Sequence, residues 1–380
     1  MNRTILLLLT FLISSLVVIG QNERRADSAT GSFVYDQPYE IIRVKPIENG
    51  RVKNVILMIG DGMGLSQVSS AWVANRGKLN LDNCTYTGFS RTWCANKLIT
   101  DSGAAGTAMA TGQKANYHSI SVDVQGNPLA SLTDLANKDG LKTGIVVTCG
   151  LYDATPAAFC AHNADRDQEE AIAADYPDCQ VDYIFGGGRD KFSKRTDGRN
   201  LLTEMEQKGY HVYTSWDETR QPLNGKVICI PTEGQLPLAR ERGDLFAKAS
   251  LQAIQILDNK KGFFAMLEAS RIDDCGHWND LPKLIDEVLD FDRSIGEVLK
   301  WAEKDGETLV IVLADHETGG LTLLDGDLKG GSVSGNFASK GHSGIMVPVY
   351  AYGPGAIAFS GIYENTEIFH KIVKLLNLKP

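Results

Sequence analysis

Apolar runs alternate with amphipathic stretches along most of this chain. Short runs rich in Val, Ile, Leu and Phe predict buried strands, and stretches with apolar residues at three- and four-residue spacing predict helices. The predicted strands span residues 54–60, 143–149, 182–185, 226–230, 262–267, 308–314 and 347–352. The predicted helices span residues 65–75, 103–111, 131–138, 167–174, 244–258, 281–304 and 364–377. This alternation indicates an α/β fold, with a large, mostly parallel central sheet and helices on both of its faces.

Two stretches interrupt the alternation. Residues 180–243 hold several short elements and a triple glycine at 186–188, and residues 317–341 are rich in Gly and Ser. We interpret both as excursions from one core, and the triple glycine as a flexible turn, because no Lys-Ser or Lys-Thr follows it as in a phosphate loop. Residues 21–50 are expected to be an extended entry segment. Residues 21–380 are therefore expected to form a single domain, in which 317–341 is a short accessory insertion.

The first 20 residues have the pattern of a secretory signal peptide. Arg3 precedes an apolar run that ends near Gly20, and polar residues follow from Gln21. The run is short for a membrane span, although an uncleaved anchor is the alternative reading. We expect cleavage near Gly20 and an exported protein, either periplasmic or secreted.

Charge and cysteine content narrow the picture further. The 380 residues carry a net charge of -9, which becomes -10 once the segment with Arg3 is removed. An acidic chain without a basic stripe is not expected to bind nucleic acid. The seven cysteines leave at least one without a partner in the chain. Cys84 with Cys94, or Cys160 with Cys179, would suit a disulfide, but spacing alone does not decide between these pairings.

Asp and His gather in three short clusters in the last third of the chain. Asp273 and His277 are four residues apart, which places both on one face of a helical turn. Asp315 and His316 end an apolar strand, and His342 follows after the 317–341 excursion. Carboxylate and imidazole ligands together suit zinc. Ligands at the carboxyl ends of strands are where open α/β sheets place their sites.

A second set of residues offers only oxygen atoms. Asp61 ends the strand at 54–60, Thr155 precedes Pro156, and Glu268 closes the strand at 262–267. Oxygen ligands alone suit magnesium. Asp153 offers a further oxygen, and Arg166 offers a planar fork of donors that fits phosphate.

Ser102 is the candidate nucleophile. It stands at the predicted start of a helix and is followed almost entirely by Gly and Ala, so other groups can approach its hydroxyl closely. Backbone N–H groups at that helix start would also face an incoming anion. A serine needs a base or a metal to become nucleophilic. Because no Gly-x-Ser-x-Gly elbow is present, a metal is the expected activator.

With these residues assembled, the chain resembles the alkaline phosphatase family. The matching blocks occur in the family's order and span roughly residues 54–355: residues 59–64, 100–108, 153–158, Arg166, 268–277, 314–316 and 341–342. The resemblance implies two zinc ions (Zn²⁺) and one magnesium ion (Mg²⁺). The first zinc would be held by Asp273, His277 and His342. The second zinc would be held by Asp61, Asp315, His316 and Ser102. The magnesium would be held by Asp61, Thr155 and Glu268, with Asp153 near its water shell.

The resemblance also implies the reaction. Ser102 would take the phosphoryl group of a small phosphate monoester at alkaline pH, Arg166 would clamp two phosphate oxygens, and water would release inorganic phosphate, which is product and inhibitor. A homodimer is implied as well, although the 317–341 segment, which builds an accessory lobe at the dimer interface in the family, is short here. Asp274 is a departure, because well-studied members carry Lys or His there, and an acid would repel phosphate or help to hold the magnesium water shell.

Three rival functions fit the sequence less well. A phosphodiesterase or nucleotide pyrophosphatase of the same superfamily would normally lack the third metal set and the arginine clamp. A sulfatase would need a Cys/Ser-x-Pro-x-Arg run, which residues 102–106 do not supply. A phosphate or zinc scavenger without catalysis would keep the ligands and lose the nucleophile, yet Ser102 is present.

Overall fold

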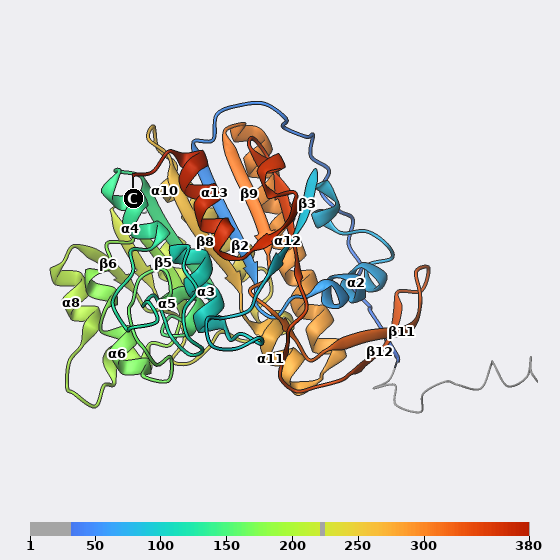
Figure 1. Cartoon of the computed structure of the whole chain (residues 1–380), viewed down its shortest axis with the longest axis horizontal. Coiled ribbons are helices and arrows are strands. Elements are labelled where there is room, and N and C mark those ends of the chain that lie inside the picture. The colour runs from blue at the N-terminus through green and yellow to red at the C-terminus, as the bar shows by residue number, and fades with distance from the viewer. Residues whose placement is uncertain (1–31, 221–224, 380) are drawn as a thin grey trace, which may run out of the picture.

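The computed structural model describes residues 32–220 and 225–379. Its centre is a sheet of ten strands crossed by helices on both faces (Figure 1). Antiparallel pairing occurs where β14 meets β3 and β9, and the other neighbours are parallel. The strand order is β15 (Gly361–Glu364), β3 (Tyr86–Arg91), β14 (Val347–Tyr352), β9 (Thr308–Leu313), β2 (Asn54–Gly60), β8 (Phe263–Ala269), β4 (Lys142–Gly150), β5 (Tyr183–Gly187), β7 (Lys226–Cys229), β6 (Tyr210–Tyr213). The predicted α/β class with a mostly parallel sheet is confirmed.

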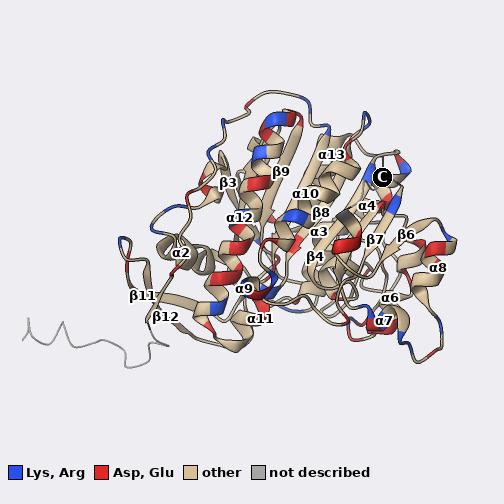
Figure 2. Ribbon diagram, turned by 180° about the vertical axis from the view of Figure 1, so that it is seen from behind, with Lys and Arg blue, Asp and Glu red and all other residues tan. Residues whose placement is uncertain are grey.

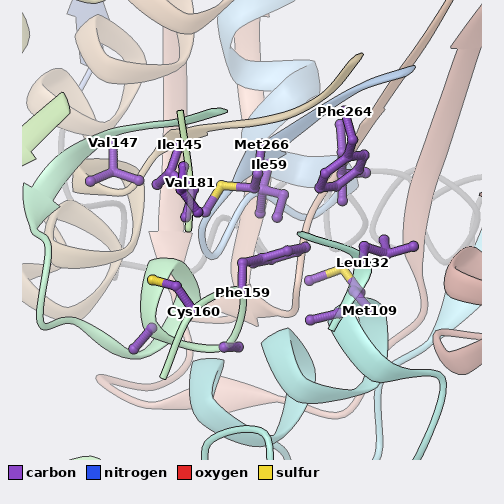
Figure 3. Packing of buried hydrophobic residues seen from close by; sticks show 14 of the residues in the cluster. Ile59, Met109, Leu132, Ile145, Val147, Phe159, Cys160, Val181, Phe264 and Met266 are labelled. Carbon is purple, nitrogen blue, oxygen red and sulfur yellow. The ribbon is translucent and has the colours of Figure 1, made fainter. Parts of the chain in front are cut away.

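Each face of the sheet carries its own hydrophobic core, because successive side chains of a strand point to opposite faces. Along β2, Val55, Leu57 and Ile59 join one core, and Ile56 and Met58 join the other. Figure 3 shows part of the first core, in which Phe159 lies between the sheet and the helices that cover it. That face is covered by α3 (Ser102–Thr111), α4 (Leu132–Lys138), α5 (Ala154–Ala157), α6 (Glu169–Ala173), α7 (Asp190–Ser193), α8 (Leu201–Gln207) and α13 (Thr366–Leu376). The second face is covered by α2 (Leu65–Ala74), α10 (Leu245–Leu257), α11 (Arg271–Trp278) and α12 (Leu281–Asp305), and α9 (Ala239–Arg242) packs against α12.

The interpretation of residues 180–243 as an excursion was wrong in part. Strands β5, β7 and β6 all lie within this stretch, and together they extend the main sheet at one edge. Two of the three glycines at 186–188 belong to β5 rather than to a flexible turn. A side chain at Gly187 would collide with the carbonyl oxygen of Gly234, so close approach of two backbones explains this glycine. The sequence pattern predicts β5 and β7 as strands and misses the four-residue β6, but it does not show that all three join the main sheet.

The 317–341 segment does leave the main sheet. It forms a small three-stranded sheet in the order β1 (Ser32–Val34), β12 (Ser332–Phe337), β11 (Leu321–Asp327). A separate antiparallel pair, β10 (Glu317–Thr318) and β13 (His342–Ser343), closes its base. The excursion therefore starts and ends at the same place, which brings His316 and His342 together.

After β1, the described part of the entry segment, residues 35–50, has no regular secondary structure. Asparagine side chains hold it against the body instead, since the amides of Tyr39 and Ile42 donate to Asn75 and Asn80. The predicted signal peptide at residues 1–20 lies outside the described residues. Within the described ranges, no helix has both the length and the apolar composition needed to cross a bilayer.

Acidic and basic residues are interspersed over the helices (Figure 2). Along α12, for example, four basic residues stand among seven acidic ones. This excess of acidic residues agrees with the acidic net charge.

Candidate metal and phosphate site

Three neighbouring strands deliver carboxylates to one edge of the sheet. Asp61 directly follows β2, Asp315 lies two residues beyond β9, and Glu268 is the penultimate residue of β8. Because β9, β2 and β8 are adjacent and parallel, their carboxyl ends meet at the same edge. The exposed fractions of these three residues are 7%, 1% and 1%, so the carboxylates are almost entirely withdrawn from solvent.

Three histidines meet the carboxylates there, and each is oriented through its Nδ1 atom. His342 Nδ1 lies 2.8 Å from the carbonyl oxygen of Thr100, His277 Nδ1 bonds the carbonyl oxygen of Lys340, and His316 Nδ1 lies 3.2 Å from Thr318 Oγ1. The Nε2 atoms of all three rings are thereby turned toward the site. Anchoring one ring nitrogen so that the other is presented is typical of histidines that bind metals.

The Nε2 atoms and carboxylate oxygens converge. His277 Nε2 and His342 Nε2 are 3.3 Å apart and lie 3.2 and 3.6 Å from oxygens of Asp273. His316 Nε2 lies 3.1 Å from Asp315 Oδ2 and 3.5 Å from Asp61 Oδ1. Each of these groups has the donor types and the closeness that a zinc site requires.

The two groups share a carboxylate. The donor atoms of Asp273, His277 and His342 all lie within 4.8 Å of one another, as do those of Asp61, Asp273 and His316. The structure thus places Asp273 beside both predicted zinc sets. Its helix, α11, carries Asp273 and His277 one turn apart, as their spacing predicts.

The carboxylates of this site are buried and repel one another, and the protein does not supply enough positive charge to balance them. Burial, reinforced by the charge of Asp315, raises the pKa of Asp61 well above its usual range. Burial, with the charge of Asp153, raises the pKa of Glu268 to about 8. Burial, with the charge of Asp273, raises the pKa of Asp315 to about 7. Among the described residues, Asp61 Oδ1, Asp315 Oδ2 and Thr155 Oγ1 are buried without a hydrogen-bond partner. Unpaired buried oxygens of this kind fit divalent cations, which would satisfy both their charge and their lone pairs.

His316 is held neutral, the form that binds a metal. Burial, with the nearby His342, lowers the pKa of His316 well below its usual range. A neutral ring leaves the Nε2 lone pair free to bind while Nδ1–H faces Thr318.

Ser102 is the first residue of α3, as the sequence predicts. Its Oγ lies 3.2 Å from His316 Nε2, and the residue is 3% exposed. Asp101 caps the helix by accepting hydrogen bonds from the amides of Gly103 and Ala104. The expectation that amides at this helix start face an incoming anion is therefore wrong for Gly103 and Ala104, because the Asp101 carboxylate already occupies these two amides.

Arg166, in the loop that follows α5, offers hydrogen-bond donors for phosphate. Its Nη1 lies 3.1 Å from Asp101 Oδ2, and its Nη2 lies 2.9 Å from Asp153 Oδ1. The two carboxylates belong to the caps of α3 and α5, so they fix the guanidinium between the two helix starts. Its side chain remains 22% exposed, which leaves it accessible to a ligand.

The residues of the oxygen-only set lie close to the helix that begins at Ser102. Thr155 is part of α5, and α5 packs directly against α3. Glu268 repels Asp61 and is repelled by Asp153, which places the acids of this set in one neighbourhood. The thiol of Cys149 lies 3.7 Å from Glu268 Oε2. All the residues predicted to bind metals or phosphate thus gather at one edge of the sheet.

Asp274, the departure from the family pattern, has a partner of its own. Arg271 Nε lies 2.5 Å from Asp274 Oδ2, and Arg271 Nη1 also donates to the carbonyl oxygen of Leu236. The carboxylate is therefore balanced by a cation three residues earlier on the same helix.

Sequence reasoning missed three residues that position the site. Asp101 holds Arg166, Thr318 bonds both His316 and Asp273, and Arg271 balances Asp274. Gly62 matters as well, because its φ is +70° and a side chain there would lie 2.8 Å from Thr318 Oγ1. The position of Asp101 just before the nucleophile was a usable signal, whereas Thr318 acts on a residue 45 positions away.

Comparison with known proteins agrees with the family resemblance seen in the sequence. The family model of alkaline phosphatase matches residues 52–334 and 332–378. Alkaline phosphatase 4 of Bacillus subtilis (strain 168) is 30% identical over 426 residues, which cover 90% of this chain and 92% of that protein. The alkaline phosphatase from the Antarctic bacterium TAB5 aligns with a TM-score of 0.83 and 37% identity, over 87% of this chain and 100% of that one. A variant of the TAB5 enzyme with magnesium bound in its M3 site aligns with a TM-score of 0.82 and 36% identity, over 89% of this chain and 100% of that one.

Proposed function

The chain belongs to the alkaline phosphatase family, whose reaction is the hydrolysis of phosphate monoesters, and we propose how its own residues perform that reaction. Ser102 is the nucleophile, Arg166 binds the phosphoryl group, and the Asp/His clusters hold two zinc ions and one magnesium ion. The observation that carries this proposal is the 3.2 Å contact of Ser102 Oγ with His316 Nε2, at the centre of converging nitrogen and carboxylate atoms.

The donor atoms divide into three sets by their chemistry. Nitrogen and carboxylate donors suit the two zinc ions, and the oxygen-only set suits magnesium. The unpaired oxygens of Asp61, Asp315 and Thr155 support this division, since each belongs to a proposed set. When bound, these cations supply Lewis acidity that favours the ionised serine oxygen and the departing oxygen of the alcohol. The proposed ligands are, for the first zinc, Asp273, His277 and His342; for the second zinc, Asp61, Asp315, His316 and Ser102; and for magnesium, Asp61, Thr155 and Glu268, with Asp153 close by.

The protein contributes positioning and charge. The ionised Ser102 oxygen attacks phosphorus in line with the leaving alcohol, so that a phosphoserine forms and the P–O bond to the alcohol breaks. Water then attacks the same phosphorus, the bond from phosphorus to Ser102 Oγ breaks, inorganic phosphate leaves, and the released Ser102 oxygen regains a proton from water. Throughout, Arg166 donates from both arms of its guanidinium to two phosphate oxygens, a bidentate geometry that an ammonium cannot match. Two in-line displacements predict net retention of configuration at phosphorus.

The salt bridge between Asp274 and Arg271 bears on phosphate affinity. Paired with a guanidinium 2.5 Å away, Asp274 repels an incoming phosphate less than a free carboxylate would. Of the two consequences expected for an acid at this position, we therefore propose weak repulsion rather than a direct role in the magnesium shell.

The test is a parallel assay of an aryl phosphate monoester and its matched diester, with zinc and magnesium at alkaline pH, using wild type and Ser102→Ala. We expect monoester preference, and the variant should lose at least about a thousandfold in kcat while still binding metal. Preference for the diester would show that Arg166 and the oxygen-only set do not act together on a dianionic phosphate. Metal binding without turnover of either ester would instead make the protein a scavenger.

We further propose a homodimer that covers an apolar patch beside the site. The patch consists of Leu98, Ile99, Ile345 and Met346, with exposed fractions of 73%, 42%, 49% and 45%. Its two segments adjoin, because Gly344 lies against the side chains of Leu98 and Ile99. Exposed apolar clusters of this kind mark interaction surfaces. Analytical ultracentrifugation of wild type and Leu98→Glu tests this proposal. A wild-type dimer that the substitution converts to a monomer would support the patch as the interface. A wild-type monomer, or a dimer that the substitution leaves unchanged, would reject it.

Export and a single catalytic domain complete the proposal. The apolar leader at residues 1–20 directs the chain to the periplasm or the medium, and residues 21–380 then form one domain with 317–341 as an accessory insertion. N-terminal sequencing of the protein from the cell exterior should find a start near residue 21.

A further inference from the structure

Two thiols meet at the base of the loop that carries Arg166. Cys160 lies just after α5, and Cys179 follows a short 3₁₀ helix, η2 (Tyr176–Asp178). Both are free thiols buried in the same hydrophobic core, with exposed fractions of 7% and 8%, and burial, with the neighbouring Cys179, raises the pKa of the Cys160 thiol. Figure 3 shows Cys160 beside Phe159 in the core under the central sheet.

The chain around these thiols already brings the two ends of the loop together. The amide of His162, two residues after Cys160, donates to the carboxylate of Asp175, four residues before Cys179, over 2.9 Å. A covalent link between the two sulfur atoms would therefore join segments that noncovalent contacts already hold in place.

Other cysteine arrangements are less favourable. Cys84 and Cys94 stand on either side of β3, whose six residues span about 20 Å at the rise of a strand. That distance far exceeds the separation that a disulfide permits. Cys149 contacts the carboxylate of Glu268 instead of another thiol. Of the two pairings that the sequence left open, the fold retains only Cys160 with Cys179.

We propose that Cys160 and Cys179 form a disulfide that closes residues 161–178 into a covalent loop and thereby steadies Arg166. The bond forms by thiol–disulfide exchange with a small-molecule disulfide such as oxidised glutathione. The two thiols give up two protons and two electrons, the S–S bond of the small molecule breaks, and two of its thiols are released.

The disulfide would affect the site because the loop that it closes carries Arg166. Arg166 lies between the two cysteines, six residues after Cys160, and its backbone amide bonds the carbonyl oxygen of His118 over 2.8 Å. Its guanidinium must be held between Asp101 and Asp153 before phosphate arrives. A loop closed at its base samples fewer conformations, so less order has to be gained when phosphate binds. This second step rests on the proposed role of Arg166, whereas the disulfide itself does not.

Burial sets the timing of the exchange. The thiolate is the reacting form, and burial raises the pKa of the Cys160 thiol well above its usual range. We therefore expect the bond to form during folding, before the loop packs, and to resist reduction in the folded protein. A reductant should open it quickly only in denaturant.

Disulfide mapping of the full chain tests the first step. The protein is refolded in a glutathione redox buffer, free thiols are alkylated under denaturing conditions, and the unreduced peptides are weighed. We expect the peptides with Cys160 and Cys179 to be joined and the other five cysteines to be alkylated. Alkylation of all seven cysteines, or a bond from either residue to a different cysteine, overturns the proposal.

Kinetics of the oxidised and reduced holoenzyme test the link to Arg166. Reduction in denaturant followed by refolding with reductant should raise KM for an aryl phosphate, and Ki for inorganic phosphate, by about threefold or more, with kcat little changed. Cys160→Ala with Cys179→Ala should show the reduced values under both conditions. Cys229→Ala, which removes a fully buried thiol elsewhere, should respond to reduction as wild type does. Equal KM and Ki in the two redox states would overturn the coupling. Because mapping needs no turnover, a failure of the proposed hydrolysis would remain distinguishable from a failure of the disulfide.

Discussion

Two clusters of buried carboxylates lie in this protein, and they are neutralised in different ways. In the first, Arg242 on α9 reaches α12, where its Nη2 lies 2.6 Å from Glu287 and 2.8 Å from Asp290. The amide of Ala239 donates to Glu287 as well. The cation is part of the chain, so this cluster is complete without any ligand.

The second cluster lies at the strand ends and lacks such a cation. Asp61 and Asp315 are as deeply buried as the acids of α12, yet each keeps one oxygen without a hydrogen-bond partner among the described residues. The guanidinium of Arg166, which the charge of Asp61 attracts, is already bound by Asp101 and Asp153. Burial raises the pKa of carboxylates in both clusters, since desolvation does not depend on function. The difference in pairing, rather than burial, separates the binding site from a structural ion pair.

Of the predicted changes in activity and stability, removal of the metals should cause the largest. Extraction with a chelator should abolish hydrolysis and lower the stability of the fold, by about 4 kcal/mol for each ion present at a thousandfold excess over its Kd. Differential scanning calorimetry and an aryl phosphate assay, with and without restored zinc and magnesium, measure both effects. An unchanged Tm after verified extraction would mean that the strand-end carboxylates need no cation.

Loss of Arg242 should have the next largest effect, and only on stability. Arg242→Met leaves Glu287 and Asp290 buried without a cation, which should cost about 3–5 kcal/mol. The kcat of the folded fraction should stay at the wild-type value, because this cluster does not touch the site. Urea denaturation measures the change in unfolding free energy.

A matched control is Arg199→Ala, which breaks an exposed ion pair with Glu204 and should cost at most about 1 kcal/mol. If both variants lose the same stability, the α12 cluster is no more than a surface pair. The triple variant Arg242→Met, Glu287→Gln and Asp290→Asn should recover much of the loss, since no charge is then left unpaired.

The contrast between the two clusters also explains what the sequence could predict. Asp61, Asp315 and Glu268 were found because each stands at the end of an apolar run, and adjacent parallel strands must end at one edge. Most strands and helices were found because long runs have a clear period. The edge strand β6 and its neighbour β7 were harder to place, because four-residue runs look the same in an excursion as in a sheet.

Pairing between distant residues could not be predicted. Nothing in the sequence distinguishes the acids of α12, which Arg242 neutralises, from the acids of the site, because the distinction depends on which cation the fold brings near. Thr318 is similar: it is an ordinary threonine until the β10–β13 pair places it between His316 and Asp273. Such roles depend on tertiary contacts that the sequence pattern does not record.

Thr318 offers a smaller and more specific test of the site. Thr318→Val keeps the shape of the side chain and removes the oxygen that orients His316 and Asp273. Metal affinity should fall by about 10–100-fold, with activity recovering at high zinc concentration. Zinc titration monitored by activity and by a competing chelator gives the affinity. An unchanged affinity would mean that the ring and the carboxylate are held without the hydroxyl.

The smallest predicted effect is the change in stability when one carboxylate is replaced by an amide, and its sign should differ between the two clusters. In the metal-free protein, Asp315→Asn should raise stability by on the order of 1 kcal/mol, because it removes a buried carboxylate charge that no cation balances and whose Oδ2 atom has no hydrogen-bond partner. The amide oxygen can still accept from the amides of Gly62 and His316, while the new NH₂ group can donate to the neutral His316 Nε2, 3.1 Å from the present oxygen. Glu287→Gln, in the paired cluster, should lower stability whether or not metal is present. Calorimetry of the chelated variants compares the two signs. If Asp315→Asn also destabilises the metal-free fold, its carboxylate is already satisfied by the protein, and the distinction between the two clusters fails.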